Sequence, residues 1–136
     1  MMISTRGRYA LRVLIDLAEH KEDSYVPMKE VAQRQEISLK YLEKILPALA
    51  KNNLIEGVHG KGGGYKLTRK PEEYTVGEIL RLTEGCLAPV SCLECNAEEC
   101  HRTSECRTLP MWTELQTRIN TYLDGVTIAD LMKVEP

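Results

Sequence analysis

The sequence predicts a mainly α-helical fold with one small β-hairpin. Apolar residues recur at helical spacing over most of the 136 residues. A short helix, a tight turn and a second, capped helix are indicated between residues 27 and 49, and a glycine-rich hairpin follows them directly. Together these observations predict a winged helix-turn-helix domain over residues 1–85, a cysteine-rich loop over 86–106, and a long helix with a short C-terminal helix over 107–136.

Three helices are predicted before the hairpin. The first is expected to end near residue 20 and carries its apolar side chains at i, i+3, i+4, i+7 and i+8, namely Ala10, Val13, Leu14, Leu17 and Ala18. A polar connector over residues 21–25 leads to Pro27, which favours the first position of a short helix that ends at Gln35 or Glu36. Ser38 is then expected to cap a third helix, whose apolar residues are Leu39, Leu42, Ile45, Leu46 and Leu49.

A β-hairpin is predicted from two segments of strand character, residues 53–58 and 65–67. The connecting sequence His59-Gly60-Lys61-Gly62-Gly63-Gly64 is rich in glycine, which is typical of a hairpin tip. Glycines at this density can also cradle a phosphate, but here no helix follows and the Gly-Lys-Ser/Thr ending of a nucleotide-binding loop is missing. The hairpin is therefore interpreted as a wing.

The remaining regular structure is predicted to be helical. Thr75 and Glu78 form the sequence pattern of a capping box, so a helix is expected over residues 76–84, ended by Gly85. Beyond the cysteines, a longer helix is predicted from apolar residues spaced alternately by three and four, which are Trp112, Leu115, Ile119, Tyr122 and Val126. This narrow seam is typical of a dimer interface, although such a stripe can also pack on its own domain. A last short helix is expected through residue 132.

All five cysteines lie within one stretch of twenty-one residues that has many charged and few apolar side chains; they are Cys86, Cys92, Cys95, Cys100 and Cys106. Cysteines in a core act as small apolar residues, but this segment has almost no apolar surface to join. Permanent disulfides are rare in a reducing compartment, where clustered cysteines more often bind metal or sense redox changes. The segment is therefore predicted to bind a soft metal centre or to act as a redox sensor.

Charge and composition narrow the function classes. Residues 1–70 contain 13 Lys and Arg against 8 Asp and Glu, whereas residues 71–136 contain 5 against 12, so the amino-terminal half carries the surface suited to a polyanion. No apolar segment is long enough to span a bilayer and no secretory signal is recognised, so a cytoplasmic location without membrane contact is expected. The three histidines lie in unrelated segments without a nucleophile and an orienting acid, so no enzyme activity is expected.

Four motifs resemble the IscR-type family of winged-helix transcriptional regulators, and the resemblance covers essentially the whole chain. They are residues 3–10 (ISTRGRYA), 37–44 (ISLKYLEK), 60–65 (GKGGGY) and 75–79 (TVGEI). In this family a homodimer reads a palindromic operator with a recognition helix in the major groove and a wing in the minor groove. The resemblance implies double-stranded DNA as the partner, contacted by Ser38, Lys40, Tyr41, Glu43, Lys44, His59, Gly60 and Lys61.

The resemblance also implies an iron-sulfur cluster, 2Fe-2S or 4Fe-4S, held by cysteines of the loop. The spacing of Cys92, Cys100 and Cys106 matches that of cluster-binding members. Two fourth ligands are known in the family. One is a histidine, replaced here by Leu109, and the other is an acidic residue of the first helix, replaced here by Arg8.

The sequence leaves alternatives open for the fourth ligand, for the metal and for the function. Cys95 is the nearest substitute for the fourth ligand and Cys86 the next, while His101, Glu105, a small thiol or water are further alternatives. A Cys-x-x-Cys pair formed by Cys92 and Cys95 would also suit zinc as a minor alternative. The main prediction is a repressor or other regulator whose operator affinity is set by the cluster. One alternative is a CymR-like repressor controlled by a protein partner or by thiol oxidation. The other is an iron-sulfur electron carrier or cluster-delivery protein.

Overall fold

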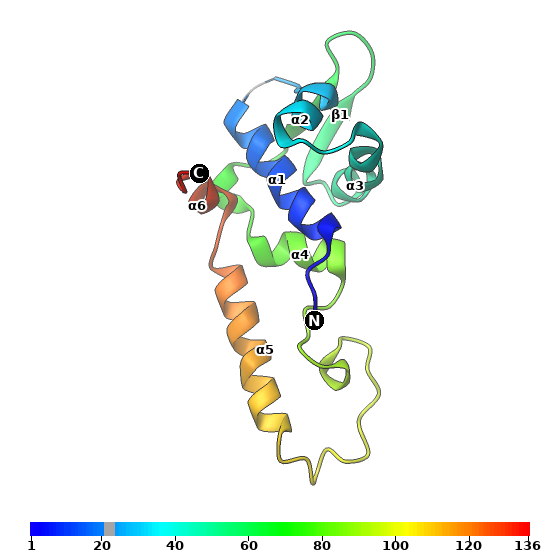
Figure 1. Cartoon of the computed structure of the whole chain (residues 1–136), viewed down its shortest axis with the longest axis vertical. Helices are drawn as coiled ribbons and strands as arrows, with labels where there is room; N and C mark the ends of the chain where they lie inside the picture. The colour runs from blue at the N-terminus through cyan, green and yellow to red at the C-terminus, as the bar shows by residue number, and fades with distance from the viewer. Residues whose placement is uncertain (21–23) are drawn as a thin grey trace.

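The computed structural model describes residues 1–20 and 24–136, so the polar connector predicted over 21–25 lies partly outside the described residues. The elements follow in the order α1 (Thr5–His20), α2 (Met28–Gln35), α3 (Leu39–Lys51), β1 (Ile55–Val58), β2 (Gly64–Leu67), η1 (Pro71–Glu73), α4 (Val76–Glu84), η2 (Ser91–Leu93), α5 (Leu109–Asp124) and α6 (Ile128–Met132). The predicted fold class, mainly helical with one antiparallel hairpin, is confirmed (Figure 1).

The hydrophobic core lies around α1, which packs against α2, α4, α6 and β2. The side chains of Leu14 and Leu17 in α1, Leu42 and Leu49 in α3, and Ile79 in α4 are at most 2% exposed. Full burial of one such side chain stabilises the folded state by roughly 1.5–3 kcal/mol. This shared core fixes α2 and α3 relative to α1, and so sets which face of α3 is left to solvent.

The turn between α2 and α3 is closed by backbone geometry. Glu36 adopts a left-handed conformation (φ 53°), which lets the N–H of Ile37 donate to the carbonyl of Ala32 at 3.1 Å. Ile37 is buried in the core. Ser38 then caps α3 as predicted, because its Oγ accepts a hydrogen bond from the N–H of Tyr41 at 3.1 Å.

The hairpin is extended by a third segment of chain. Val58 pairs with Gly64 at the turn end of the hairpin. Tyr65 also pairs with Val26, through N–H to carbonyl bonds of 2.8 and 3.0 Å. The backbones approach so closely that a Cβ on Gly64 would lie 2.1 Å from the Val26 carbonyl oxygen, and the φ of Gly64 is 150°. Glycine is therefore required at this position.

The predicted α4 helix has the expected bounds, but one half of its capping box is absent. The Thr75 side chain accepts from the N–H of Glu78 at 3.1 Å, and Gly85 ends the helix with φ 81°. The carboxylate of Glu78 does not return to the N-cap backbone. It binds the Arg69 guanidinium instead, at 2.8 and 3.1 Å, since Arg69 approaches α4 from the segment that follows the wing.

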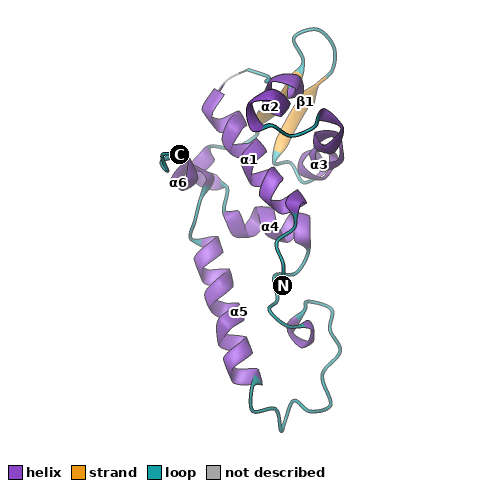
Figure 2. Ribbon diagram, in the orientation of Figure 1, coloured by secondary structure: helices purple, strands orange, loops and turns teal. Residues whose placement is uncertain are grey.

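The two C-terminal helices differ in how they pack. The N–H of Ile128 donates to the carbonyl of Tyr74 at 3.0 Å, which places α6 against α1 and η1, with Ile128 fully buried. By contrast, α5 contains no buried residue and projects away from the winged-helix part (Figure 2). The chain between Cys86 and Thr108 forms a long loop that runs from the end of α4 to the far end of α5 (Figure 1).

Tyr74→Phe is expected to lower the free energy of unfolding by about 1–3 kcal/mol, because a buried hydroxyl and its partners lose their hydrogen bonds. The Tyr74 hydroxyl is fully buried, donates to the Leu54 carbonyl at 2.6 Å and accepts from the N–H of Arg69 at 3.1 Å. Urea denaturation measures the change. Thr113→Val is the control, because it also removes one hydroxyl, Thr113 is exposed on α5, and the change should stay within about 0.5 kcal/mol. Equal stability of the two variants would contradict the assigned role.

Candidate functional site

The solvent-facing side of α3 carries most of the residues predicted to contact DNA. Lys40, Glu43 and Lys44 are all exposed, as is the capping residue Ser38. Lys40 and Lys44 are one helical turn apart, so their ammonium groups project from the same side of the helix. This arrangement leaves two cations and one carboxylate free to meet phosphates or base edges.

Tyr41 differs from the other predicted contact residues because it is half-buried. Its ring packs edge-on against the ring of Tyr9 in α1, with centroids 5.4 Å apart and an interplanar angle of 78°. The Arg12 guanidinium lies 5.0 Å from the Tyr9 ring centroid on the same helix. Part of the Tyr41 side chain is thus used to join α3 to α1.

A buried carboxylate holds α2 against α1. Asp16 has no exposed surface and accepts from the Arg34 guanidinium at 2.6 and 3.0 Å and from the Gln35 side-chain amide at 2.9 Å. Hydrogen bonding to Asp16 raises the pKa of Arg34, which stays charged. The network fixes the last turn of α2, immediately before the turn into α3. Sequence reasoning missed it, although an acidic residue within the apolar stripe of α1 was the available signal.

The wing presents its tip to solvent. His59, Gly60 and Lys61 are exposed, as the predicted contact to a nucleic acid would require. Gly60 and Gly62 have φ values of 94° and 79°, and the N–H of Gly63 donates to the Gly60 carbonyl at 3.0 Å, closing the tip. These left-handed conformations favour glycine, and at the glycines, which have no side chain, the backbone can approach another backbone closely.

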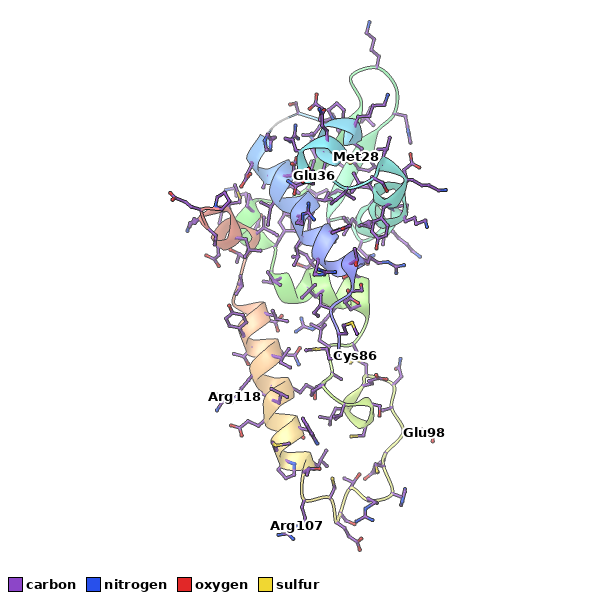
Figure 3. All side chains as sticks on the ribbon, in the orientation of Figure 1. Met28, Glu36, Cys86, Glu98, Arg107 and Arg118 are labelled. Carbon is purple, nitrogen blue, oxygen red and sulfur yellow. A yellow bond between two sulfur atoms is a disulfide. The ribbon has the colours of Figure 1, made fainter. Side chains whose placement is uncertain are left out.

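The cysteine loop begins at a junction with the amino-terminal helix. Glu84, near the end of α4, accepts from the backbone N–H of Ser4 at 3.0 Å, from that of Gly7 at 3.2 Å, and from the Ser4 hydroxyl at 2.5 Å. Its carboxylate therefore stabilises the start of α1, where helix N–H groups lack partners. Cys86 follows two residues later (Figure 3).

The structure joins two of the five cysteines by a disulfide. Cys86 and Cys95 are bonded, with Cα atoms 5.8 Å apart, and the N–H of Cys95 donates to the Cys86 sulfur at 2.9 Å. In this state neither residue is available as the fourth metal ligand considered from the sequence. The pairing also departs from the expectation that cysteines of this segment would stay unpaired in a reducing compartment.

The three cysteines predicted as cluster ligands are the free ones. Cys92 and Cys100 are exposed and Cys106 is half-buried. A hydrogen bond with the Thr108 hydroxyl, 3.5 Å from the sulfur, lowers the pKa of the Cys106 thiol and favours the thiolate that binds metals. Within the part of the chain that the structure describes, however, no three His, Cys, Asp or Glu side chains are gathered as a metal site.

In chemical type, the free thiols fit a soft metal or an iron-sulfur cluster, because thiolates are the preferred ligands of both. The segment that carries Cys100 and Cys106 is held by backbone hydrogen bonds between residues close in sequence. The N–H of Thr103 donates to the Cys100 carbonyl at 3.0 Å, and that of Glu105 to the Arg102 carbonyl at 2.9 Å. Both bonds join residues three apart in the sequence, so this part of the loop is held by local turns.

Comparison with known proteins gives a consistent result. A model of the Rrf2 family, described as iron-dependent transcriptional regulators, matches residues 3–134. The regulator IscR of Aliivibrio salmonicida is 36% identical over 133 residues, which is 97% of this chain and 77% of that protein. The protein rrf2 of Nitratidesulfovibrio vulgaris is 41% identical over 133 residues, covering 98% of this chain and 88% of that protein.

Solved structures of similar proteins include both kinds of regulator considered from the sequence. CymR, the global cysteine regulator of B. subtilis, superposes with a TM-score of 0.81 at 32% identity, over 100% of this chain and 99% of that one. IscR of T. potens superposes with a TM-score of 0.75 at 32% identity, over 98% of this chain and 87% of that one. Neither the fold nor these identities separates the two kinds.

Proposed function

We propose that this chain, which belongs to the Rrf2 family of transcriptional regulators, binds a palindromic operator as a cytoplasmic homodimer and that a metal cluster in its cysteine loop sets the affinity. Its place in that family makes it a DNA-binding regulator and not an enzyme. None of the described helices is long and apolar enough to cross a membrane. The observation that carries the proposal is the exposed lysine face of α3 beside an exposed, glycine-rich wing.

The physical basis for DNA contact is specific to these side chains. Lys40 and Lys44 can each donate to a phosphate or to the O6 and N7 acceptors of guanine, and Glu43 can accept from the N4 amine of cytosine. On the wing, Lys61 supplies a permanent cation at the exposed tip. We therefore assign most of the base reading to α3, and backbone positioning to the wing.

Lys44→Ala and Lys40→Ala are each expected to weaken operator binding by about 1–3 kcal/mol where the side chain reads a base. Where it meets a phosphate, the slope of log affinity against log salt should fall by about one unit. Fluorescence anisotropy over a salt series measures both quantities. Lys133→Ala is the control, since Lys133 is exposed beyond α6. Identical affinity and slope for all three variants and the parent would remove α3 from the interface.

For the cluster, we propose Cys92, Cys100 and Cys106 as ligands, because they are the thiols that the Cys86–Cys95 disulfide leaves free. A bound cluster would supply a redox-sensitive and oxygen-sensitive centre. Anaerobic purification followed by an absorption spectrum and by iron and sulfide analysis tests this directly. Visible charge-transfer bands with stoichiometric iron and sulfide support a cluster, whereas stoichiometric zinc without sulfide refutes it.

For the homodimer, the supporting observation is the state of α5. Its apolar residues Met111, Leu115 and Tyr122 are 52%, 39% and 71% exposed, which is unusual for a helix that has to be stabilised by burial. Leu115 and Tyr122 belong to the predicted seam, whereas Trp112 and Ile119 are half-buried. We propose that the exposed side of α5 packs against a second copy of the chain and so spaces the two recognition helices.

A second candidate mechanism is control by thiol oxidation without a cluster. The disulfide between Cys86 and Cys95 favours it, as does the likeness to CymR. The spectrum separates the two mechanisms, because a protein controlled only by thiols is colourless and contains neither iron nor sulfide. Cluster control and thiol control both require that the protein bind its operator. An iron-sulfur electron carrier, the other alternative raised by the sequence, would not bind it.

A further inference from the structure

The Cys86–Cys95 disulfide closes a ring of chain, residues 86–95, at the base of the cysteine loop. The start of this ring is anchored to the winged-helix part. Leu87 is only 3% exposed and belongs to a small apolar cluster with Val76 and Leu80 of α4. A change in the ring would therefore alter the packing of Leu87 against Val76 and Leu80 of α4.

The far side of the ring touches α5. The side-chain amide of Gln116 donates to the carbonyl of Leu93 at 3.1 Å, and Leu93 ends the short helix η2 inside the ring. This hydrogen bond joins two residues that are 23 positions apart in the sequence. The ring thus bridges α4 and the middle of α5.

The other attachment of α5 lies near its C-terminal end. Arg81 of α4 donates to the Asp124 carboxylate at 2.7 and 2.9 Å and to Asn120 at 2.9 Å. This ion pair lowers the pKa of Asp124, which keeps its negative charge. Among the described residues, the amino-terminal half of α5 has no comparable ion pair to the winged-helix part, and the Gln116–Leu93 hydrogen bond joins it to the ring instead.

We propose that Cys86 and Cys95 form a reversible thiol–disulfide switch that sets how firmly the amino-terminal half of α5 is held to the winged-helix part. The inference rests on the proposed function, in which α5 spaces the recognition helices of a dimer. With the ring closed, Gln116 has a fixed partner in Leu93. With the ring open, Cys95 is no longer held beside Cys86, so Leu93 loses its fixed position against Gln116.

The chemistry of the switch is thiol–disulfide exchange with a low-molecular-weight disulfide such as oxidised glutathione. One cysteine thiolate attacks the glutathione disulfide, forming a mixed disulfide and releasing one glutathione thiolate. The second cysteine thiolate then attacks the protein sulfur of the mixed disulfide and releases the second glutathione. The two protein thiols lose two electrons and two protons in total, and one oxidised glutathione becomes two reduced ones.

The switch also divides the five cysteines into two groups. Closing the ring withdraws Cys95 from the thiols proposed as cluster ligands and leaves Cys92, Cys100 and Cys106 unpaired. Cys92 itself lies inside the ring, so its position is constrained in the closed state. The same oxidation would therefore change both the support of α5 and the set of thiols open to a metal.

The covalent step is tested by peptide mapping of the full chain. The protein is equilibrated anaerobically in buffers of increasing oxidised-to-reduced glutathione ratio, its free thiols are alkylated, and it is cleaved by glutamyl endopeptidase. Cleavage after Glu84, Glu94 and Glu98 separates peptide 85–94 from peptide 95–98. We expect the two to be joined at high ratios and released at low ratios. Joining should persist in Cys92→Ser and disappear in Cys86→Ser.

The conformational step is tested by amide hydrogen exchange of residues 109–117 in the same buffers. We expect exchange to be several-fold faster in the reduced protein, with no redox dependence in Cys86→Ser. Absence of the joined peptide at every ratio overturns the inference, and so does equal exchange in both states. A protein that binds operator without forming the joined peptide refutes the switch alone. A protein that forms it, and shows the exchange difference, but binds no operator refutes the proposed function and supports the switch.

Discussion

Replacing Cys92, Cys100 or Cys106 singly with alanine is expected to abolish the visible absorbance of the anaerobically purified protein. Each change removes one of the three thiolates proposed to hold the cluster, and a cluster held by two protein thiolates is lost to solvent and chelators. The fold should survive, because the loop residues 96–106 are held by local turns and the winged-helix core contains no cysteine. Circular dichroism and thermal unfolding check the fold beside the spectrum.

Cys86→Ala is the matched control, and the colour should persist in it. Cys95→Ala shows whether the reduced protein uses Cys95 as a fourth ligand, since loss of colour in that variant makes it one. Leu109→His restores the histidine of the family at the first residue of α5, and it should slow cluster loss only where Cys95 does not already bind. An unchanged spectrum in all three single variants of the proposed ligands would refute the site.

The elements that sequence reasoning predicted well are those specified by short-range signals. Ser38 and Thr75 cap α3 and α4 because their side chains bond backbone groups three residues on, a contact that depends on no distant part of the chain. The glycines of the wing are similarly local, since a left-handed φ is a property of the residue itself. Such signals fixed the order and the approximate bounds of the helices and the hairpin.

The features that sequence reasoning missed depend on the path of the whole chain. Asp16 interrupts an apolar stripe, but its burial is tolerated only because Arg34 and Gln35 arrive from α2 to satisfy it. Likewise, Glu78 matched a capping box by spacing, yet it binds Arg69, which lies nine residues earlier in the sequence. A pattern of residue types cannot predict which of two nearby partners a charged side chain will choose.

The cysteines show the same limit at the candidate site. The family resemblance and the spacing indicated Cys92, Cys100 and Cys106 as ligands, with Cys95 and then Cys86 as substitutes for the fourth. The structure pairs Cys95 with Cys86, nine residues away, since the chain turns back through η2 after the buried Leu87. The spacing of the cysteines does not predict this pairing, because it depends on the path of residues 86–95 in space.

Leu115→Glu is expected to convert the proposed dimer into monomers. Leu115 lies on the exposed apolar side of α5 with Met111 and Tyr122, and a carboxylate there would be desolvated against the partner. Burying an unpaired charge at an interface costs about 3–5 kcal/mol, which is enough to separate a dimer at micromolar concentration. Sedimentation velocity measures the assembly state.

Operator binding by the Leu115→Glu variant should fall about 100-fold or more, because a monomer loses the high effective concentration of its second recognition helix. Thr113→Glu is the matched control: it adds the same charge two residues away on α5, at another exposed position. Its dimer and its operator affinity should both be preserved. If Leu115→Glu stays dimeric, or if Thr113→Glu dissociates equally, the exposed apolar side of α5 is not the interface and the two recognition helices are spaced by another surface.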